Sequence, residues 1–146
     1  MLRVASVVVV GCALLLSACS SVDSPTQATA SSPLPVIAIS SFAVSAETAG
    51  TGLSYRTSYQ VAETSGRANA LINTVTFAFG SGSFVTNANP SSPARLPAGT
   101  TLLSGVLNIS DSAGLTTGAT SVTLTIGWVD EIGRGGTIAS TATITR

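Results

Sequence analysis

The residues whose types and spacing most plainly suggest chemistry stand at the start of the chain. A single positive charge, Arg3, precedes an apolar run over residues 4–16, and small residues follow at Ser17-Ala18 before Cys19. A charged start, an apolar segment of this length and small residues at a cleavage point are the parts of an export signal. The cysteine directly after them makes the pattern more specific than a leader alone. The start of the chain therefore predicts export.

The stretch Leu16-Ser17-Ala18-Cys19 resembles the lipobox of bacterial lipoprotein precursors. The resemblance covers about the first twenty residues. It implies that the leader is cut off just before Cys19 and that this cysteine becomes a lipidated first residue, carrying an acyl chain such as palmitate. The resemblance thus implies a protein held on a membrane by lipid.

Two other interpretations of the leader stay open. It could be an ordinary secretory signal, or an uncleaved anchor formed by the uncharged residues 4–22, although their apolar part is short for a membrane span. The residue after Cys19 is Ser20 and not Asp. In lipoproteins of bacteria with two membranes, an Asp directly after the lipidated cysteine is associated with retention at the inner membrane. The resemblance therefore implies the outer membrane or the cell surface for this chain.

Catalytic groups are scarce in the rest of the chain. The sequence contains no His, and its six bases are all Arg, so neither a His nor a Lys base is available. The second cysteine, Cys12, belongs to the leader. A Ser activated by a carboxylate alone would be an unusual nucleophile. We therefore expect no enzyme activity and no cofactor.

Charge and cysteine content exclude further classes. The precursor has six acids and six bases, and removal of Arg3 leaves five bases against six acids, a net charge near −1. Without a basic patch, nucleic acid is not an expected partner. With both cysteines in or at the leader, no disulfide supports the domain, so an apolar core must stabilise it.

Composition divides the chain into three parts: the signal peptide 1–18, a linker 19–35 and one domain 36–146. The linker is rich in Ser, Pro and Thr and carries one charge, Asp23. Such a segment buries too little apolar surface to fold by itself. We expect it to act as a flexible spacer between the lipid and the domain.

From Val36 the hydrophobic pattern alternates with a period of two, which predicts strands. The alternation changes phase at Ser40-Ser41, which predicts a bulge. A further short strand is possible around Phe84-Val85. The apolar positions predicted for the successive strands are Ile37 and Ile39 with Phe42 and Val44; Leu53, Tyr55, Thr57, Tyr59 and Val61; Leu71, Val75, Phe77 and Phe79; Leu103, Leu107 and Ile109; Val122, Leu124, Ile126 and Trp128; and Ile138, Ala142 and Ile144.

Six or seven such strands in about 110 residues predict an all-β fold, a single immunoglobulin-like antiparallel β-sandwich. The domain resembles bacterial Ig-like and fibronectin-type sandwiches in size and strand number. It departs from true immunoglobulin domains because it lacks core cysteines and a tyrosine corner, and because its one tryptophan, Trp128, falls on the penultimate strand.

In this topology one end of the sandwich would gather five charged residues, which we call the charged pole: Glu63, Arg67, Asp130, Glu131 and Arg134. Glu47 and Asp111 would fall at the opposite end, the far pole. We expect the charged pole to be a solvated rim whose charges compensate one another. A ligand-binding end and a Ca²⁺ site made by Asp130, Glu131 and Glu63 are the alternatives, and we expect no metal.

These features favour a lipid-anchored envelope protein that presents a small Ig-like domain to a protein or a glycan, as in adhesion. The last strand, rich in Thr and free of Pro, is a plausible edge for strand addition. The alternative is a structural or assembly lipoprotein within a periplasmic or outer-membrane complex.

Overall fold

The computed structural model describes residues 32–50, 52–80 and 84–146, all within the compact unit Ser31–Arg146. These residues form strands and loops, so the prediction of an all-β domain is confirmed. None of them belongs to a helix long and apolar enough to cross a membrane. The lipobox Leu16-Ser17-Ala18-Cys19 and most of the linker lie outside the described residues.

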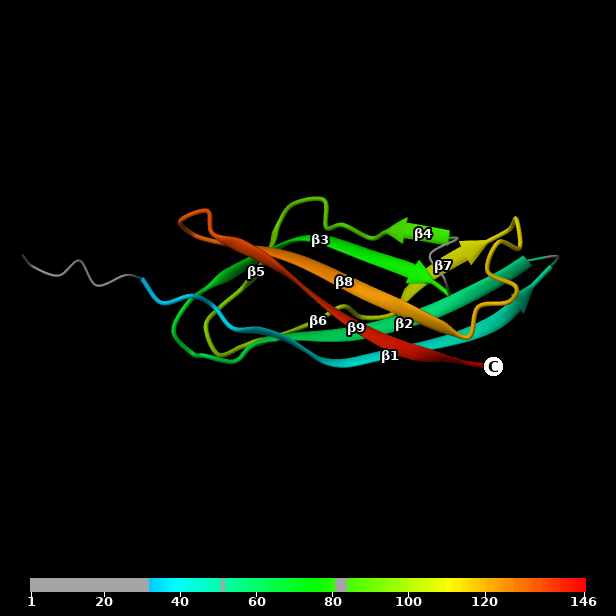
Figure 1. The fold of residues 1–146 in the computed structure, drawn as a ribbon, viewed down its shortest axis with the longest axis horizontal. Coiled ribbons are helices and arrows are strands. Elements are labelled where there is room, and N and C mark those ends of the chain that lie inside the picture. Colours follow the sequence, from blue (N-terminus) through cyan, green and yellow to red (C-terminus); the bar gives the residue numbers. More distant parts are fainter. Residues whose placement is uncertain (1–31, 51, 81–83) are drawn as a thin grey trace, which may run out of the picture. The chain divides into compact units, whose positions relative to one another are not determined.

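Nine strands are formed, and they are labelled in Figure 1. They are β1 (Ile37–Ala49), β2 (Gly52–Glu63), β3 (Ala70–Phe79), β4 (Phe84–Asn87), β5 (Ala94–Leu96), β6 (Thr101–Leu103), β7 (Leu107–Asp111), β8 (Ser121–Asp130) and β9 (Gly135–Thr145). The prediction of six or seven strands is wrong for two reasons. The short strand β5 was not foreseen, and Gly105, with a φ of 68°, takes the chain out of the extended region and divides one predicted strand into β6 and β7.

The strands form one mixed sheet that curls into a half-barrel, in the order β4-β3-β8-β9-β1-β2-β6, with β5 beside β3 and β7 beside β2. Every neighbouring pair is antiparallel except β1 and β9. These two run parallel and pair only at Val44–Ile144 and Ser45–Thr145. The prediction of a purely antiparallel arrangement is wrong at this junction, because the first and last strands both run from the charged pole towards the far pole.

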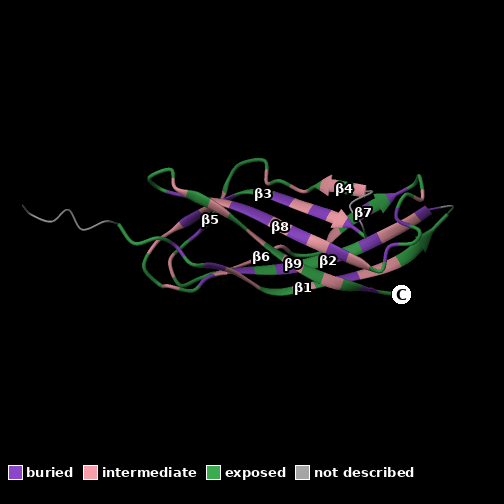
Figure 2. Ribbon diagram, in the orientation of Figure 1, coloured by how far each residue is buried: buried purple, intermediate pink, exposed green. Residues whose placement is uncertain are grey.

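The core lies inside the curl, where the buried side chains alternate along the strands (Figure 2). Strands β2 and β8 direct the predicted residues inward, and Trp128 is half-buried. Tyr55 packs against Phe79 with a distance of 4.5 Å between ring centroids. Phe84, which was not expected in the core, packs edge-on against Phe79 at 5.5 Å. All seven aromatic residues are therefore buried or half-buried.

Two strands depart from the predicted inward phase. The register of β3 against β8 shifts between Ile72 and Thr74, so Ile72 is buried and Leu71 is not. The bulge predicted at Ser40-Ser41 is confirmed by the register shift in β1 between Ile39 and Ser41. Leu103 faces the solvent, since the break after β6 uncouples its phase from that of β7.

Candidate binding surfaces

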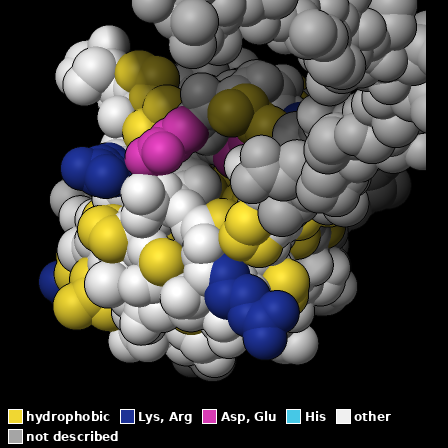
Figure 3. Space-filling model, turned by 90° about the vertical axis from the view of Figure 1, so that its left-hand side faces the viewer, with side chains coloured by type: hydrophobic (Ala, Val, Ile, Leu, Met, Phe, Trp, Pro, Cys, Tyr) yellow, Lys and Arg dark blue, Asp and Glu magenta, His cyan; other side chains and the backbone are white. Residues whose placement is uncertain are grey.

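The charged pole is a real cluster of side chains. Arg67, Asp130, Glu131 and Arg134 line one hollow of about 270 Å³, together with Ser32 and other residues of the loops. Figure 3 looks at this end of the domain. The hollow is built where the loop after β2 meets the turn between β8 and β9.

Glu63 does not belong to a solvated rim, and that expectation is wrong for this residue. Its side chain is 2% exposed at the end of β2. One carboxylate oxygen accepts hydrogen bonds from the backbone N–H groups of Val36 and Ser65, each 3.0 Å away, and from the Ser65 hydroxyl. The other oxygen accepts backbone N–H groups of Gly66 and Gly99, both at 2.8 Å. Glu63 therefore ties three separate segments together.

The electrostatics of Glu63 follow from these donors. Burial by itself raises the pKa of the Glu63 carboxyl group, because it removes water from the charge. The hydrogen bonds from the side chain of Ser65 and from the backbone outweigh burial and hold the pKa at about 2. Glu63 is thus ionised at neutral pH, and its charge is balanced by backbone dipoles and not by a cation.

Asp130 is also buried, which is the second correction to the solvated rim. One oxygen accepts the backbone N–H groups of Ile132 and Arg134, and the other accepts Nε of Arg134 at 2.6 Å. Burial raises the pKa of Asp130, but the bonds from Arg134 outweigh it and leave the pKa below its usual value. The remaining guanidinium nitrogens of Arg134 donate to the carbonyl oxygens of Ser32 and Pro33 at 2.9 and 3.1 Å.

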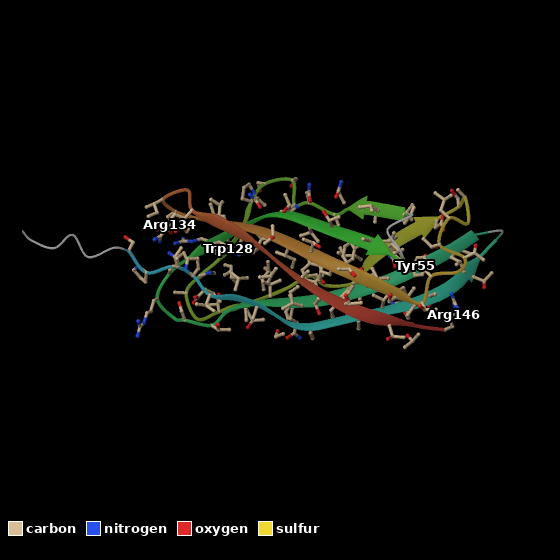
Figure 4. All side chains as sticks on the ribbon, in the orientation of Figure 1. Tyr55, Trp128, Arg134 and Arg146 are labelled. Atoms are coloured by element: carbon tan, nitrogen blue, oxygen red, sulfur yellow. The ribbon has the colours of Figure 1, made fainter. Side chains whose placement is uncertain are left out.

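Arg134 therefore clamps the end of the predicted linker onto the domain (Figure 4). Pro35 is buried, and the N–H of Val36 is bound by Glu63. Residues 32–35 were assigned to the flexible linker, whereas the structure holds them against the charged pole.

Glu131 is the exposed acid of the charged pole. It accepts a hydrogen bond from the side-chain amide of Asn69 at 2.8 Å and lies 3.5 Å from a guanidinium nitrogen of Arg95. Within the described part of the chain, no three side chains of the His, Cys, Asp or Glu type meet as a metal site. Both oxygens of Asp130 are already occupied by donors, which disfavours it as a Ca²⁺ ligand.

The far pole holds a different polar network, built around Asp111. Its Oδ2 accepts the backbone N–H and the hydroxyl of Thr116 at 2.7 and 2.6 Å. The Tyr55 hydroxyl donates to Oγ1 of Thr116 at 2.6 Å. The pKa of Asp111 is lowered, mainly by the Thr116 hydroxyl and against the effect of burial. Its Oδ1 is buried without a hydrogen-bond partner among the described residues.

This network fastens the loop between β7 and β8 to the core strand β2. A hydroxyl held between a carboxylate and a phenol has the polarity of an activated nucleophile. Thr116 is only 1% exposed, however, so a substrate cannot reach its hydroxyl in this fold. We assign the network a structural role. Sequence reasoning placed Asp111 at this pole but gave no signal for its partners, because Tyr55 is 61 residues from Thr116.

Strand β9 lies between β8 and β1, but it pairs with β1 only at Ile144 and Thr145, so the edge of its first part is open among the described strands. The N–H of Ile144 bonds the carbonyl oxygen of Thr120, and Asp130 N–H bonds the carbonyl oxygen of Arg134, so the even-numbered residues of β9 face β8. Backbone groups alternate along a strand. Those of Thr137, Ala139 and Thr141 therefore point away from β8, and no described strand pairs with them.

A shallow groove lies where this edge meets β1. Its volume is about 510 Å³, and its lining comes from β1, β2 and β9 with Val106. Most of the lining is small or apolar, with one cation, Arg56. The guanidinium of Arg56 lies 3.8 Å from the carboxylate of Glu47, and both side chains are exposed.

No protein-family model matches the chain, and a search of curated proteins found no match.

Proposed function

We propose that this protein is a lipid-anchored lipoprotein of the bacterial envelope whose single non-catalytic domain binds a protein partner by strand addition to β9. Cys19, at the end of the lipobox Leu16-Ser17-Ala18-Cys19, is the acylated residue. The domain stands on the outer membrane or the cell surface, because Ser20 and not Asp follows the cysteine.

The finer fold in this proposal is an immunoglobulin-like sandwich. In that fold the first, second, fourth and fifth strands form one sheet, and the third, sixth and seventh form the other. The order β3-β8-β9 beside β1-β2-β6 supports this assignment, although β4 pairs with β3 and not with the strands around β1 and β2. The inner faces of the two groups of strands supply the core.

The observation that carries the binding function is the open edge of β9. Natural sheets protect such edges with charged residues, Pro or bulges. The eleven residues of β9 contain no charge and no Pro, and the register of β9 against β8 is continuous. An extended peptide can therefore bond to Thr137, Ala139 and Thr141, as in β-augmentation.

A protein partner fits the surface better than a glycan. Sugar recognition commonly uses exposed aromatic rings, and all seven aromatic residues of this chain are buried or half-buried. The groove beside β1 and β9 offers room for side chains of an added strand. Backbone bonding would supply affinity, and the groove would supply selectivity.

Cross-linking on cells tests the open edge. Partners captured through a photo-reactive group at Thr141 are compared between the wild type, Ala139→Pro and Ala139→Ser. Proline removes an N–H that points away from β8, so it blocks the edge and leaves the β8 ladder intact. Serine changes the same side chain and keeps the N–H. Loss of capture in Ala139→Pro alone is expected, and equal capture in all three proteins would refute the edge as the binding site.

Protease treatment of intact cells tests the anchor and the location, with Cys19→Ala as the control. Digestion of the wild-type domain on whole cells supports surface display and binding. Protection until the outer layer is opened favours the alternative, an assembly role inside the envelope. Equal processing and equal membrane retention of the Cys19→Ala protein would contradict lipidation.

A further inference from the structure

The charged pole combines exposed apolar side chains with arginines at the place where the linker leaves the domain. Of the large apolar residues that are exposed, Leu34, Val36 and Ile132 lie here, at 54%, 53% and 65% exposure. Ile132 lines the same hollow as Pro33, and Leu34 and Val36 follow directly along the chain. Exposed apolar residues gathered beside charged groups mark an interaction site.

The exposed charged side chains of the domain are mostly arginines. The described residues contain five acids and five arginines, and three of the acids, Glu63, Asp111 and Asp130, are buried. Beside the charged pole, Arg67 and Arg95 are exposed, and Arg95 lies 3.5 Å from the one exposed acid there, Glu131. Arg67 forms no ion pair with any described residue. Figure 3 shows hydrophobic, cationic and acidic side chains together on this face.

The clamp at Arg134 fixes the place where the chain enters the domain. Because Ser32 and Pro33 are bonded to Arg134, that place is the charged pole. Only twelve residues separate Cys19 from Ser32. Twelve residues reach at most about 40 Å even when fully extended. If Cys19 carries the proposed lipid, the charged pole is therefore the part of the domain that the chain joins most directly to the membrane.

We propose that the charged pole is a membrane-contact surface, in which Leu34, Val36 and Ile132 enter the headgroup region while Arg67 and Arg95 bind anionic headgroups. Apolar side chains flanked by arginines have the composition of interfacial membrane contacts. Anionic lipid attracts arginines near the surface. This inference rests on the proposed lipid anchor and gives the domain a fixed orientation, with the far pole directed outward.

The single tryptophan reports on this contact. Trp128 lies at the same end as Arg134 (Figure 4), and its ring packs against Gly136. The acylated protein is incorporated into vesicles of anionic lipid that contain lipids with a nitroxide on the headgroup, and quenching of Trp128 is measured. Every sample keeps the Cys19 anchor, so failure of the protein to attach would refute the anchor and not the contact surface.

Three proteins separate the contact from the tether: the wild type, a pole variant with Leu34→Ser and Ile132→Ser, and a control with Val106→Ser and Leu115→Ser. The control residues are similarly exposed, at 58% and 57%, but Val106 precedes β7 and Leu115 lies in the loop after β7 at the far pole. We expect the quenched fraction to fall by roughly half in the pole variant and to stay unchanged in the control. Equal quenching in all three overturns the proposal.

The arginines are tested by comparing anionic with neutral vesicles. Arg67→Gln with Arg95→Gln should abolish the extra quenching in anionic lipid, whereas Arg56→Gln with Arg146→Gln, an equal charge change at the far pole, should leave it. If both double variants lose the extra quenching to the same degree, the vesicles attract the protein through its net charge alone. That result would overturn the charged pole as a specific contact surface. Self-association of the protein that depends on Ile132, without lipid quenching, would assign the patch to a second copy and also overturn it.

Discussion

The two ends of the domain bury carboxylates in different ways. At the charged pole, Glu63 receives four backbone N–H groups from three segments, and Asp130 is bound by Arg134. At the far pole, Asp111 is bound by one residue five positions away and keeps one oxygen unpartnered among the described residues. Glu63 is therefore a long-range tie, whereas Asp111 shapes its own loop.

The difference matters because buried charge costs free energy unless it is satisfied. The hydrogen bonds of Glu63 offset that cost, and they join the start of β1, the end of β2 and the segment at Gly99. Asp111 joins its own loop to the core only through Thr116 and Tyr55. We therefore expect the side-chain network at the charged pole to contribute more to the stability of the domain than the network at the far pole.

Replacing Glu63 should have the largest effect on stability. In Glu63→Gln an amide group faces N–H donors, so we expect the free energy of unfolding to fall by about 3 kcal/mol. Denaturant unfolding measures this. The matched control is Glu131→Gln, an exposed acid at the same pole, for which the loss should stay within about 0.5 kcal/mol. A similar loss in both variants would mean that burial of Glu63 contributes nothing special.

Acid should weaken the domain through the same residue. The pKa of Glu63 is lowered from 4.5 to about 2, so the unfolded chain takes up the proton first. The stabilisation is therefore complete above pH 4.5 and disappears as the pH falls towards 2. Unfolding curves measured across this range should show a steeper decline in the wild type than in Glu63→Gln. Parallel declines would assign the acid sensitivity to other groups.

Loss of the clamp should free the linker without unfolding the domain. Arg134→Gln removes the donors to Ser32 and Pro33 and also the Nε donor to the buried Asp130, which keeps its two backbone N–H donors. The domain should therefore stay folded with a lower free energy of unfolding. We expect faster proteolytic cleavage around residues 32–34 at an almost unchanged rate elsewhere. Arg67→Gln, at the same pole but without described bonds from its guanidinium, should cleave like the wild type.

Tyr55→Phe should weaken the far pole modestly. The substitution removes the hydroxyl that donates to Thr116 and keeps the ring against Phe79. We expect a loss of about 1 kcal/mol in the free energy of unfolding. The matched control, Tyr59→Phe, keeps its ring near Phe77 and has no described hydroxyl partner. An equal loss of unfolding free energy in both variants would mean that the hydrogen bond to Thr116 adds no stability of its own.

Calcium should have the smallest effect of all. Both oxygens of Asp130 are occupied, and the described residues form no metal cluster. The melting temperature is therefore expected to be the same in millimolar Ca²⁺ and in chelator. A rise of several degrees would indicate a bound ion, because a ligand of the native state stabilises it.

Sequence patterns predicted some elements well and others poorly. The inward residues of β2 and β8 follow directly from a period of two, since a strand with one buried face must alternate. The bulge in β1 was visible as a change of phase. The bulge at Asn73 in β3 is not visible in this way, because Leu71 and Ile72 are both apolar and either could be the inward residue. The pattern therefore predicted Leu71 inward, whereas the structure buries Ile72.

The burial of the charged residues could not be predicted from the sequence either. Their grouping at one pole could be expected once the order of the strands was guessed, but their burial could not. Whether Glu63 faces water depends on Val36 and Gly99, which are 27 and 36 residues away. The exposed residues Leu34, Val36 and Ile132 follow no period that could reveal them, because two precede β1 and the third lies in the turn between β8 and β9.

The sequence by itself predicted one all-β domain, which the structure confirms, and an export leader ending in a lipobox, which stays a prediction. These properties depend on residue type and on spacing within one segment, which the chain carries locally. Only the tertiary structure decided which carboxylates are buried, where the linker is clamped and which edge stays open. Those outcomes depend on strands that are distant in sequence, because a hydrogen bond or an unpaired edge exists only once the neighbouring strands are in place.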